Sequence, residues 1–158
     1  MKTAADIMTP DPVTVTPETT LREAARLLLE GHFNGLPVVE DGRLAGLITR
    51  SDLVSLGRKV YAPGYFLLLG GAVPLQLPGR FEHAVERMTA TTVGEVMTAE
   101  PCTVSPGTSL EDLATTMVER RWYSLPVVEG ERLVGIVGME DLFRQLAEPP
   151  HDDYCHPL

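Results

Sequence analysis

The chain is poor in cysteine, in tryptophan and in positive charge. Its 158 residues include two cysteines, one tryptophan, and 13 lysines and arginines against 22 acidic residues, for a net charge of -9. Cys102 and Cys155 follow no metal-ligand or disulfide spacing, so we expect free thiols and no metal site. Binding of DNA or RNA needs a dense basic face, so nucleic acid is not expected as the main partner.

Long hydrophobic runs are also missing. The longest apolar stretch, Tyr65 to Leu77, is interrupted by Gly70, Gly71 and Pro74 and is too short to span a bilayer. No basic segment precedes an apolar run near the start of the sequence, so no secretion signal is expected. A hydrophobic fraction of 44% is that of an ordinary globular protein. We therefore expect a cytoplasmic protein without a membrane span.

An internal repeat organises the sequence. Residues 6–53 align without a gap with residues 95–142, at a constant offset of 89, and about 20 of the 48 pairs are identical. DIMTPDPVTVTPETTL returns as EVMTAEPCTVSPGTSL, and HFNGLPVVEDGRLAGLITRSDL returns as RWYSLPVVEGERLVGIVGMEDL. A repeat of this length is one supersecondary unit, and two copies bury what one leaves exposed.

Each copy is predicted to contain a short helix, a very short strand (13–15 and 102–104), a longer helix, two strands joined by a tight turn, and a closing helix. Alternation and β-branched residues predict the strands. Apolar stripes predict the longer helices, and their residues are Leu21, Ala24, Ala25 and Leu28 in the first copy and Leu110, Leu113, Ala114 and Met117 in the second. A Ser or Thr followed three residues later by an acidic residue predicts a helix start. The four predicted caps are Thr3 with Asp6, Thr20 with Glu23, Thr92 with Glu95, and Ser109 with Asp112.

The predicted fold class is α/β (α+β), with two repeats related by a pseudo-twofold axis. Neither small mixed sheet can cover both of its faces alone, so we expect the copies to pack sheet to sheet with helices outside. The expected organisation is a first domain at residues 3–58, an apolar insert at 59–91 with a helix at 81–88, a second domain at 92–148, and a flexible tail at 149–158.

The repeated motifs resemble those of a tandem pair of cystathionine-β-synthase-like (CBS) domains, often called a Bateman module. The features are DIMT and EVMT, LPVVE in both copies, and GLITRSDL and GIVGMEDL where a strand meets a helix. The resemblance implies a regulatory protein that binds an adenine nucleotide or adenosyl ligand (AMP, ADP, ATP or S-adenosylmethionine) in the cleft between the copies. It also implies a homodimer.

In the first copy, residues 46–52 resemble the family's ribose and phosphate motif. Asp52 is expected to accept hydrogen bonds from the two ribose hydroxyls, with Thr49 beside the sugar. Arg50 and Ser51 are expected to meet phosphate. The alternative is that Asp52 and Thr49 serve only their own helix start and strand end.

The second copy departs from this motif. It keeps Asp141 but has Gly138, Met139 and Glu140 where the first copy has Thr49, Arg50 and Ser51. We expect a weaker site for an uncharged adenosyl ligand, or a structural remnant. The predicted base-binding residues, which the resemblance implies and which could equally be core strand, are Thr14, Val15, Gly35, Leu36 and Pro37, with Thr103, Val104, Ser124, Leu125 and Pro126 in the second copy.

The leading functional hypothesis is a regulatory module that binds its ligand chiefly at the first copy and signals to a partner protein. The alternative is a ligand-free dimerisation or adaptor module that acts through the insert, whose apolar residues include Phe66 and Leu68. No catalytic residues are predicted, because neither a phosphate loop nor a nucleophile with its base is present. No cofactor is expected to be required.

Overall fold

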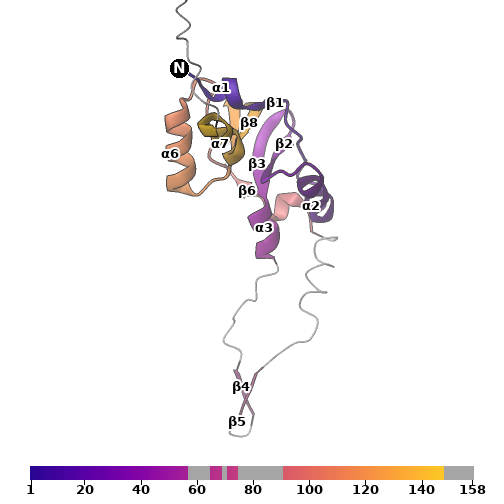
Figure 1. Ribbon diagram of the computed structural model, residues 1–158. Coiled ribbons are helices and arrows are strands. Elements are labelled where there is room, and N and C mark those ends of the chain that lie inside the picture. The colour runs from indigo at the N-terminus through magenta and orange to yellow at the C-terminus, as the bar shows by residue number, and fades with distance from the viewer. Residues whose placement is uncertain (57–64, 69–70, 75–90, 148–158) are drawn as a thin grey trace, which may run out of the picture. The chain divides into compact units, whose positions relative to one another are not determined.

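The computed structural model describes residues 1–56, 65–68, 71–74 and 91–147 (Figure 1). The chain divides into two compact units. The first-copy unit consists of Thr14–Glu40 and Ala45–Ala99. The second-copy unit consists of Met1–Val13, Asp41–Leu44 and Glu100–Leu158.

The first-copy unit contains a three-stranded sheet with helices packed against it. Its strands lie in the order β2-β3-β6, and β6 is antiparallel to β3, with Gly46 opposite Ala99. Its elements are α2 (Leu21–Glu30), β2 (Gly35–Glu40), β3 (Arg43–Thr49), α3 (Arg50–Ser55), α5 (Val93–Val96) and β6 (Thr98–Ala99).

The second-copy unit repeats this arrangement. Its strands lie in the order β1-β8-β7 and are antiparallel, with Ser124 opposite Gly138 and Thr9 opposite Ile136. Its elements are α1 (Ala4–Ile7), β1 (Thr9–Pro10), α6 (Leu110–Arg120), β7 (Ser124–Glu129), β8 (Arg132–Gly138) and α7 (Met139–Ala147). The predicted α+β class with two small sheets flanked by helices is confirmed.

The opening segments of the two copies are exchanged between the units. The amide of Ala4, in α1, donates to the carbonyl of Thr108 at 2.8 Å, and β1 pairs with β8. In the same way the amide of Val93, in α5, donates to the carbonyl of Thr19 at 2.8 Å, and β6 pairs with β3. Each unit is therefore completed by a short helix and strand that open the other repeat in the sequence.

A close approach explains one conserved feature of the repeat, a glycine in the middle of β3 and of β8. A Cβ atom added to Gly46 would lie 2.6 Å from the sulfur of Met97, and one added to Gly135 would collide with the sulfur of Met8. Real Cβ atoms do not come this close to a sulfur atom. The glycines leave room for the methionines of the exchanged segments.

The hydrophobic residues that the helix stripes predicted form two separate cores. Leu21, Ala24 and Leu28 of α2 are buried, as are Leu113 and Met117 of α6. The prediction was wrong for Ala114, which is exposed because the buried stripe of α6 is narrower than that of α2. Phe33 packs against the first core and Trp122 against the second, as expected.

The four predicted helix caps are confirmed. The amide of Thr3 donates to Asp6 at 2.7 Å and the amide of Thr92 to Glu95 at 2.8 Å. The hydroxyls of Thr20 and Ser109 accept from the amides three residues later, at 3.2 and 3.1 Å. These bonds satisfy N–H groups that the first turn of a helix leaves without a partner.

The very short strands predicted at 13–15 and 102–104 are reduced to single bridges. Val15 pairs in parallel with Val38, and Val104 with Val127. In each copy only the valine pairs with the neighbouring strand, and the prolines and threonines on either side of it form no strand. Val15 donates to the carbonyl of Pro37 at 3.0 Å and accepts from Val39 at 2.9 Å.

Only part of the insert lies within the described residues. There, β4 (Tyr65–Leu68) pairs with β5 (Gly71–Pro74) in an antiparallel hairpin. The helix predicted at 81–88 and the tail at 149–158 lie outside the described residues. None of the helices in the described part of the chain has the length and hydrophobicity needed to cross a membrane.

Candidate functional site

The motif of the first copy lies where β3 ends and α3 begins. Thr49 is the N-cap of α3, and its amide and hydroxyl donate to Oδ2 of Asp52 at 2.8 and 2.9 Å. The amide of Asp52 donates back to the Thr49 hydroxyl at 3.3 Å. The two side chains thus form a capping box, as the structural alternative for these residues anticipated.

The capping box leaves half of the Asp52 carboxylate available. Both described bonds to this side chain end on Oδ2, and Oδ1 accepts no hydrogen bond from the described residues. An ionised carboxylate offers about four lone-pair sites on its two oxygens. Asp52 is half-buried, so the capping role fixes its orientation and still leaves an acceptor for a ligand.

Arg50 holds the end of α2. Its Nε donates to the carbonyl of Phe33 at 2.6 Å, and its Nη2 donates to the carbonyl of Leu28 at 3.2 Å. Its own amide donates to the carbonyl of Asn34 at 3.1 Å. A guanidinium group has five N–H donors, and these side-chain bonds use two of them. Sequence reasoning missed this contact, since carbonyl groups carry no residue-specific signal.

The predicted base-binding residues belong to the same unit. Gly35, Leu36 and Pro37 are buried at the start of β2, Val15 is buried beside them, and Thr14 is exposed. A Cβ atom on Gly35 would lie 3.4 Å from Cγ2 of Thr49. The structure therefore brings the glycine next to the capping box. The side chains of Val15 and Leu36 lie in the first hydrophobic core, and the N–H and C=O groups of Val15 are bonded to Pro37 and Val39.

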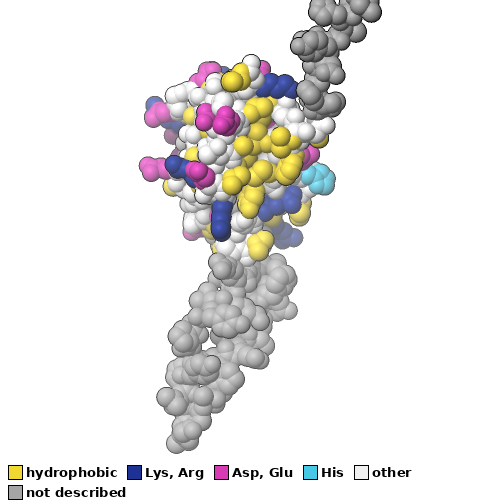
Figure 2. All heavy atoms as spheres, turned by 60° about the vertical axis from the view of Figure 1, so that its left-hand side comes forward, with side chains coloured by type: hydrophobic (Ala, Val, Ile, Leu, Met, Phe, Trp, Pro, Cys, Tyr) yellow, Lys and Arg dark blue, Asp and Glu magenta, His cyan; other side chains and the backbone are white. Residues whose placement is uncertain are grey.

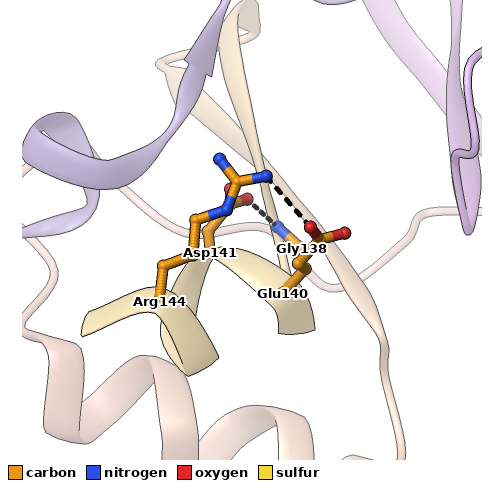
Figure 3. Close-up of polar contacts among 4 residues, drawn as sticks. All are labelled: Gly138, Glu140, Asp141 and Arg144. Carbon is orange, nitrogen blue, oxygen red and sulfur yellow. Dashed lines mark hydrogen bonds and ion pairs between the residues drawn. The ribbon is translucent and has the colours of Figure 1, made fainter. Parts of the chain in front are cut away.

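The second copy keeps the same backbone arrangement with fewer polar groups. The amide of Gly138 donates to Oδ2 of Asp141 at 2.7 Å (Figure 3), which matches the bond from Thr49 to Asp52 but lacks the hydroxyl. Met139 packs against the second core. A Cβ atom on Gly138 would meet Asp141 at 3.5 Å, an ordinary contact, so a side chain could be accommodated there.

Glu140, which precedes Asp141, forms an ion pair within α7. Its carboxylate accepts from Nη2 of Arg144 at 2.9 Å, one helical turn along α7 (Figure 3). The hydrogen bond and charge of Glu140 raise the pKa of the Arg144 guanidinium. The spacing of four residues could have predicted this pair from the sequence. Both side chains are exposed, so Arg144 only partly offsets the negative charge of Glu140 at the start of α7.

The remaining predicted residues of the second copy follow those of the first. Ser124, Leu125 and Pro126 are buried, Val104 is half-buried and Thr103 is exposed. His32 and Arg121, at the ends of α2 and α6, both adopt left-handed backbone conformations, with φ of 53° and 55°. Among the residues that the structure describes, no cluster of histidine, cysteine or acidic side chains could hold a metal ion.

Comparison with known proteins identifies the family of this chain. The CBS domain profile matches residues 4–59 and 93–148. The chain belongs to the CBS domain family and contains a tandem pair of these domains.

Individual relatives agree with this assignment. The chain is 32% identical over 142 residues to the CBS domain-containing protein YhcV of Bacillus subtilis. The aligned region covers 90% of this chain and 84% of that protein. Some other curated relatives are longer, and the chain spans 57% of one and 46% of another.

Two solved structures carry adenosyl compounds. The crystal structure of CBSX2, from Arabidopsis thaliana, in complex with AMP has a TM-score of 0.69 and 28% identity, and covers 93% of this chain and 97% of its own. The CBS domain pair of protein MJ0100, in complex with 5-methylthioadenosine and S-adenosyl-L-methionine, has a TM-score of 0.69 and 25% identity with the same coverage.

Proposed function

We propose that this chain is a regulatory module that binds an adenine nucleotide or a related adenosyl ligand, chiefly at the first copy. The observation that carries the proposal is the half-buried Asp52 carboxylate, which is fixed through Oδ2 and retains Oδ1 as an acceptor. The ligands of the similar CBSX2 and MJ0100 structures support the ligand class. A carboxylate held in this way can accept from the hydroxyls of a ribose.

Each part of the proposed site has a role that follows from its chemistry. Asp52 accepts from the ribose, and Thr49 holds Asp52 and offers its remaining lone pair to a sugar hydroxyl. Ser51, which is exposed, and the N–H groups of Arg50 that remain available meet a phosphate. The base is proposed to lie against residues 14–15 and 35–37, where Gly35 leaves room for a flat ring.

The second copy is proposed to bind more weakly or not at all. Asp141 is fixed by one amide bond where Asp52 is fixed by an amide and a hydroxyl. The second copy also lacks the cation of Arg50 and the hydroxyl of Ser51, and loss of one charge-assisted contact to a ligand costs about 1.5–3 kcal/mol, which is roughly 10- to 100-fold in affinity. An uncharged adenosyl ligand suits this position better than a phosphate, because Glu140 lies at the start of α7.

Isothermal titration with AMP, ADP, ATP and S-adenosylmethionine tests the proposal. We expect heat of binding with at least one of these ligands, and loss of that heat in Asp52→Ala. The Asp141→Ala protein is the matched control, because it removes the equivalent carboxylate from the other unit. No heat with any of the four ligands rejects the function. The regulated partner is proposed to be a cytoplasmic protein that binds one ligand state more tightly than the other.

Homodimerisation is a second candidate function, and a repeated surface feature favours it. Leu29 of α2 and Val118 of α6 occupy equivalent positions and are 68% and 71% exposed. Val54 of α3 and Phe143 of α7 are likewise equivalent, and are 72% and 63% exposed. In the view of Figure 2, hydrophobic side chains gather in a patch on the surface of the described residues. Exposed apolar groups of this kind are typical of interfaces.

Light scattering at micromolar concentration tests this candidate. We expect a dimer for the natural chain and a monomer for Phe143→Glu, because a buried carboxylate opposes association. Glu18→Lys, which changes an exposed charge outside these helices, is expected to remain dimeric. A natural chain that is monomeric at this concentration removes the basis of the candidate. AMP binding is measured separately, so the two functions stand or fall independently.

A further inference from the structure

We propose that Arg50 is a positioning residue for every adenosyl ligand of the first site, including ligands without phosphate. The inference rests on the proposed function. Arg50 is expected from the motif to meet phosphate, but its described contacts are with the protein's own backbone. Those contacts join two parts of the site that are distant in the sequence.

Three hydrogen bonds from this one residue reach the last turn of α2 and the segment between α2 and β2. They run from Nη2 to the carbonyl of Leu28 at 3.2 Å, from Nε to that of Phe33 at 2.6 Å, and from the backbone amide to that of Asn34 at 3.1 Å. The next residue is Gly35, whose Cβ position lies 3.4 Å from Thr49. Arg50 therefore ties the proposed base side of the site to its ribose side.

The segment that Arg50 holds is also fixed by a backbone bond from Phe33 to Leu28 and by packing of Phe33 against the first core, but its polar residues lie outside that core. The last carbonyls of a helix lack partners within the helix, and a cation is favourable at that end. The chain then turns through His32, whose φ of 53° is uncommon for a residue other than glycine. His32 and Asn34 are exposed, so core packing does not restrain them. The guanidinium adds a restraint that joins this segment to the start of α3.

The second copy shows the same backbone without this restraint. The amide of Met139 donates to the carbonyl of Tyr123 at 3.0 Å, which matches the bond from Arg50 to Asn34. The amide of Trp122 donates to Met117 at 3.1 Å, which matches the bond from Phe33 to Leu28 at 3.0 Å. The Met139 side chain has no donor and packs against the second core. The extra bonds thus depend on the arginine side chain alone.

Adenosine separates this positioning role from a phosphate contact. Adenosine carries no phosphate, so its affinity is insensitive to a residue that acts only on phosphate. A residue that keeps the binding conformation populated affects adenosine and AMP alike. If Arg50→Met lowers the population of that conformation to about a tenth, the apparent affinity for adenosine falls about tenfold.

The experiment is isothermal titration of the full chain with adenosine and with AMP. Arg50→Met introduces the residue found at the equivalent position of the second copy. Arg22→Met is the matched control, since Arg22 is an exposed arginine of α2 that makes no hydrogen bond or ion pair with the described residues. We expect adenosine to bind Arg50→Met about tenfold more weakly, AMP to lose at least as much, and Arg22→Met to bind both as the natural chain does.

Hydrogen exchange of the ligand-free proteins gives an independent readout. We expect the amides of Phe33 and Asn34 to exchange faster in Arg50→Met than in the natural chain, while the amides of Trp122 and Tyr123 are unchanged. Unchanged adenosine affinity in Arg50→Met overturns the proposal. If AMP binding is weaker in the same variant, Arg50 acts only as a phosphate contact. If instead the melting temperature is lower, Arg50 acts only as a cap of α2.

A second variant keeps the test decisive if Arg50→Met does not fold. Arg50→Lys retains the charge but lacks the planar fork that reaches two carbonyls at once. We expect a smaller but measurable loss of adenosine affinity, and full adenosine affinity in this variant contradicts the proposal. If the natural chain binds neither adenosine nor AMP, the proposed function itself fails and the positioning role fails with it.

Discussion

The two copies share a backbone and differ in what their side chains leave available for a ligand. In both, an aspartate at the start of the closing helix accepts from a backbone amide three residues earlier, at 2.8 Å in the first copy and 2.7 Å in the second. This bond explains why the aspartate persists even where ligand-binding groups are missing. The difference lies in a hydroxyl, a guanidinium and a serine, which the second copy replaces with glycine, methionine and glutamate. A shared aspartate is therefore weak evidence for a ligand, and the residues around it are stronger evidence.

The largest expected effect comes from removing the charge of Asp52. In Asp52→Asn the amide oxygen can still accept from Thr49, so the fold is retained, but the charge and one acceptor are lost. With two charge-assisted hydrogen bonds to a ribose weakened, we expect adenosyl affinity to fall about 100-fold. Isothermal titration measures the affinity, and thermal unfolding checks that the cap survives.

The same substitution in the other unit is the control for that experiment. Asp141→Asn is expected to leave binding at the first copy within about twofold, since the altered group is not part of that site. A loss of affinity in Asp141→Asn that equals the loss in Asp52→Asn removes the proposed difference between the copies.

A smaller effect is expected from the hydroxyl that only the first copy has. Thr49→Val keeps the shape of the side chain but removes both hydrogen bonds of the hydroxyl to Asp52. We expect about a tenfold loss of adenosine affinity and a loss of about 1 kcal/mol in the free energy of unfolding, because the N-cap is lost. Calorimetry and urea unfolding measure the two effects.

The reverse change in the second copy sharpens this comparison. Gly138→Thr adds a hydroxyl where a Cβ atom has room, 3.5 Å from Asp141. We expect a gain of about 1 kcal/mol in unfolding free energy from the new cap, and tighter adenosine binding at the second copy. If Gly138→Thr lowers the free energy of unfolding, the helix starts of α3 and α7 are not equivalent capping sites.

The charge of residue 51 is expected to affect AMP alone. Ser51→Glu copies the acidic residue found at position 140 of the second copy and places a negative charge next to Arg50. We expect AMP affinity to fall about tenfold and adenosine affinity to stay unchanged, because only AMP carries a repelled group. Equal losses for the two ligands indicate that the substitution disturbs α3 rather than the phosphate.

The smallest effect concerns acid stability of the second-copy unit. The amide and hydroxyl of Thr3 hold the pKa of the Asp6 carboxyl below its ordinary value of 3.8. A lowered folded-state pKa means that the contribution of this cap is present above the ordinary value and is lost as pH falls through the folded-state value. We expect Asp6→Asn to reduce the acid sensitivity of α1. Hydrogen exchange of the amide of Met8, which donates to Ala4, measures this effect.

Local patterns predicted much of this fold. The caps at Thr3, Thr20, Thr92 and Ser109 depend on neighbours within one turn, so the sequence is sufficient to place them. The exchange of α1 and α5 between the units was beyond the sequence, because both repeats present nearly the same docking surface and the choice depends on the path of the chain. The single bridges at Val15 and Val104 replaced strands for a similar reason, since pairing depends on a distant partner.

The residues of the candidate site stay a prediction from the sequence, and the structure adds the contacts that they make. Thr49 and Asp52 were identified together, and the capping box that joins them follows from their spacing. The bonds of Arg50 to Phe33 and Leu28 could not be foreseen, because they end on carbonyl groups that every residue has. The direction of the Arg50 side chain depends on the end of α2, and only folding brings the end of α2 close to Arg50.

A crystal structure of the chain grown with AMP tests the central claim most directly. We expect one nucleotide per chain, with a ribose hydroxyl within hydrogen-bonding distance of Oδ1 of Asp52 and with the position beside Asp141 empty. A nucleotide bound beside Asp141 alone contradicts the account, as does a chain without nucleotide whose Asp52 Oδ1 is bonded to its own side chains.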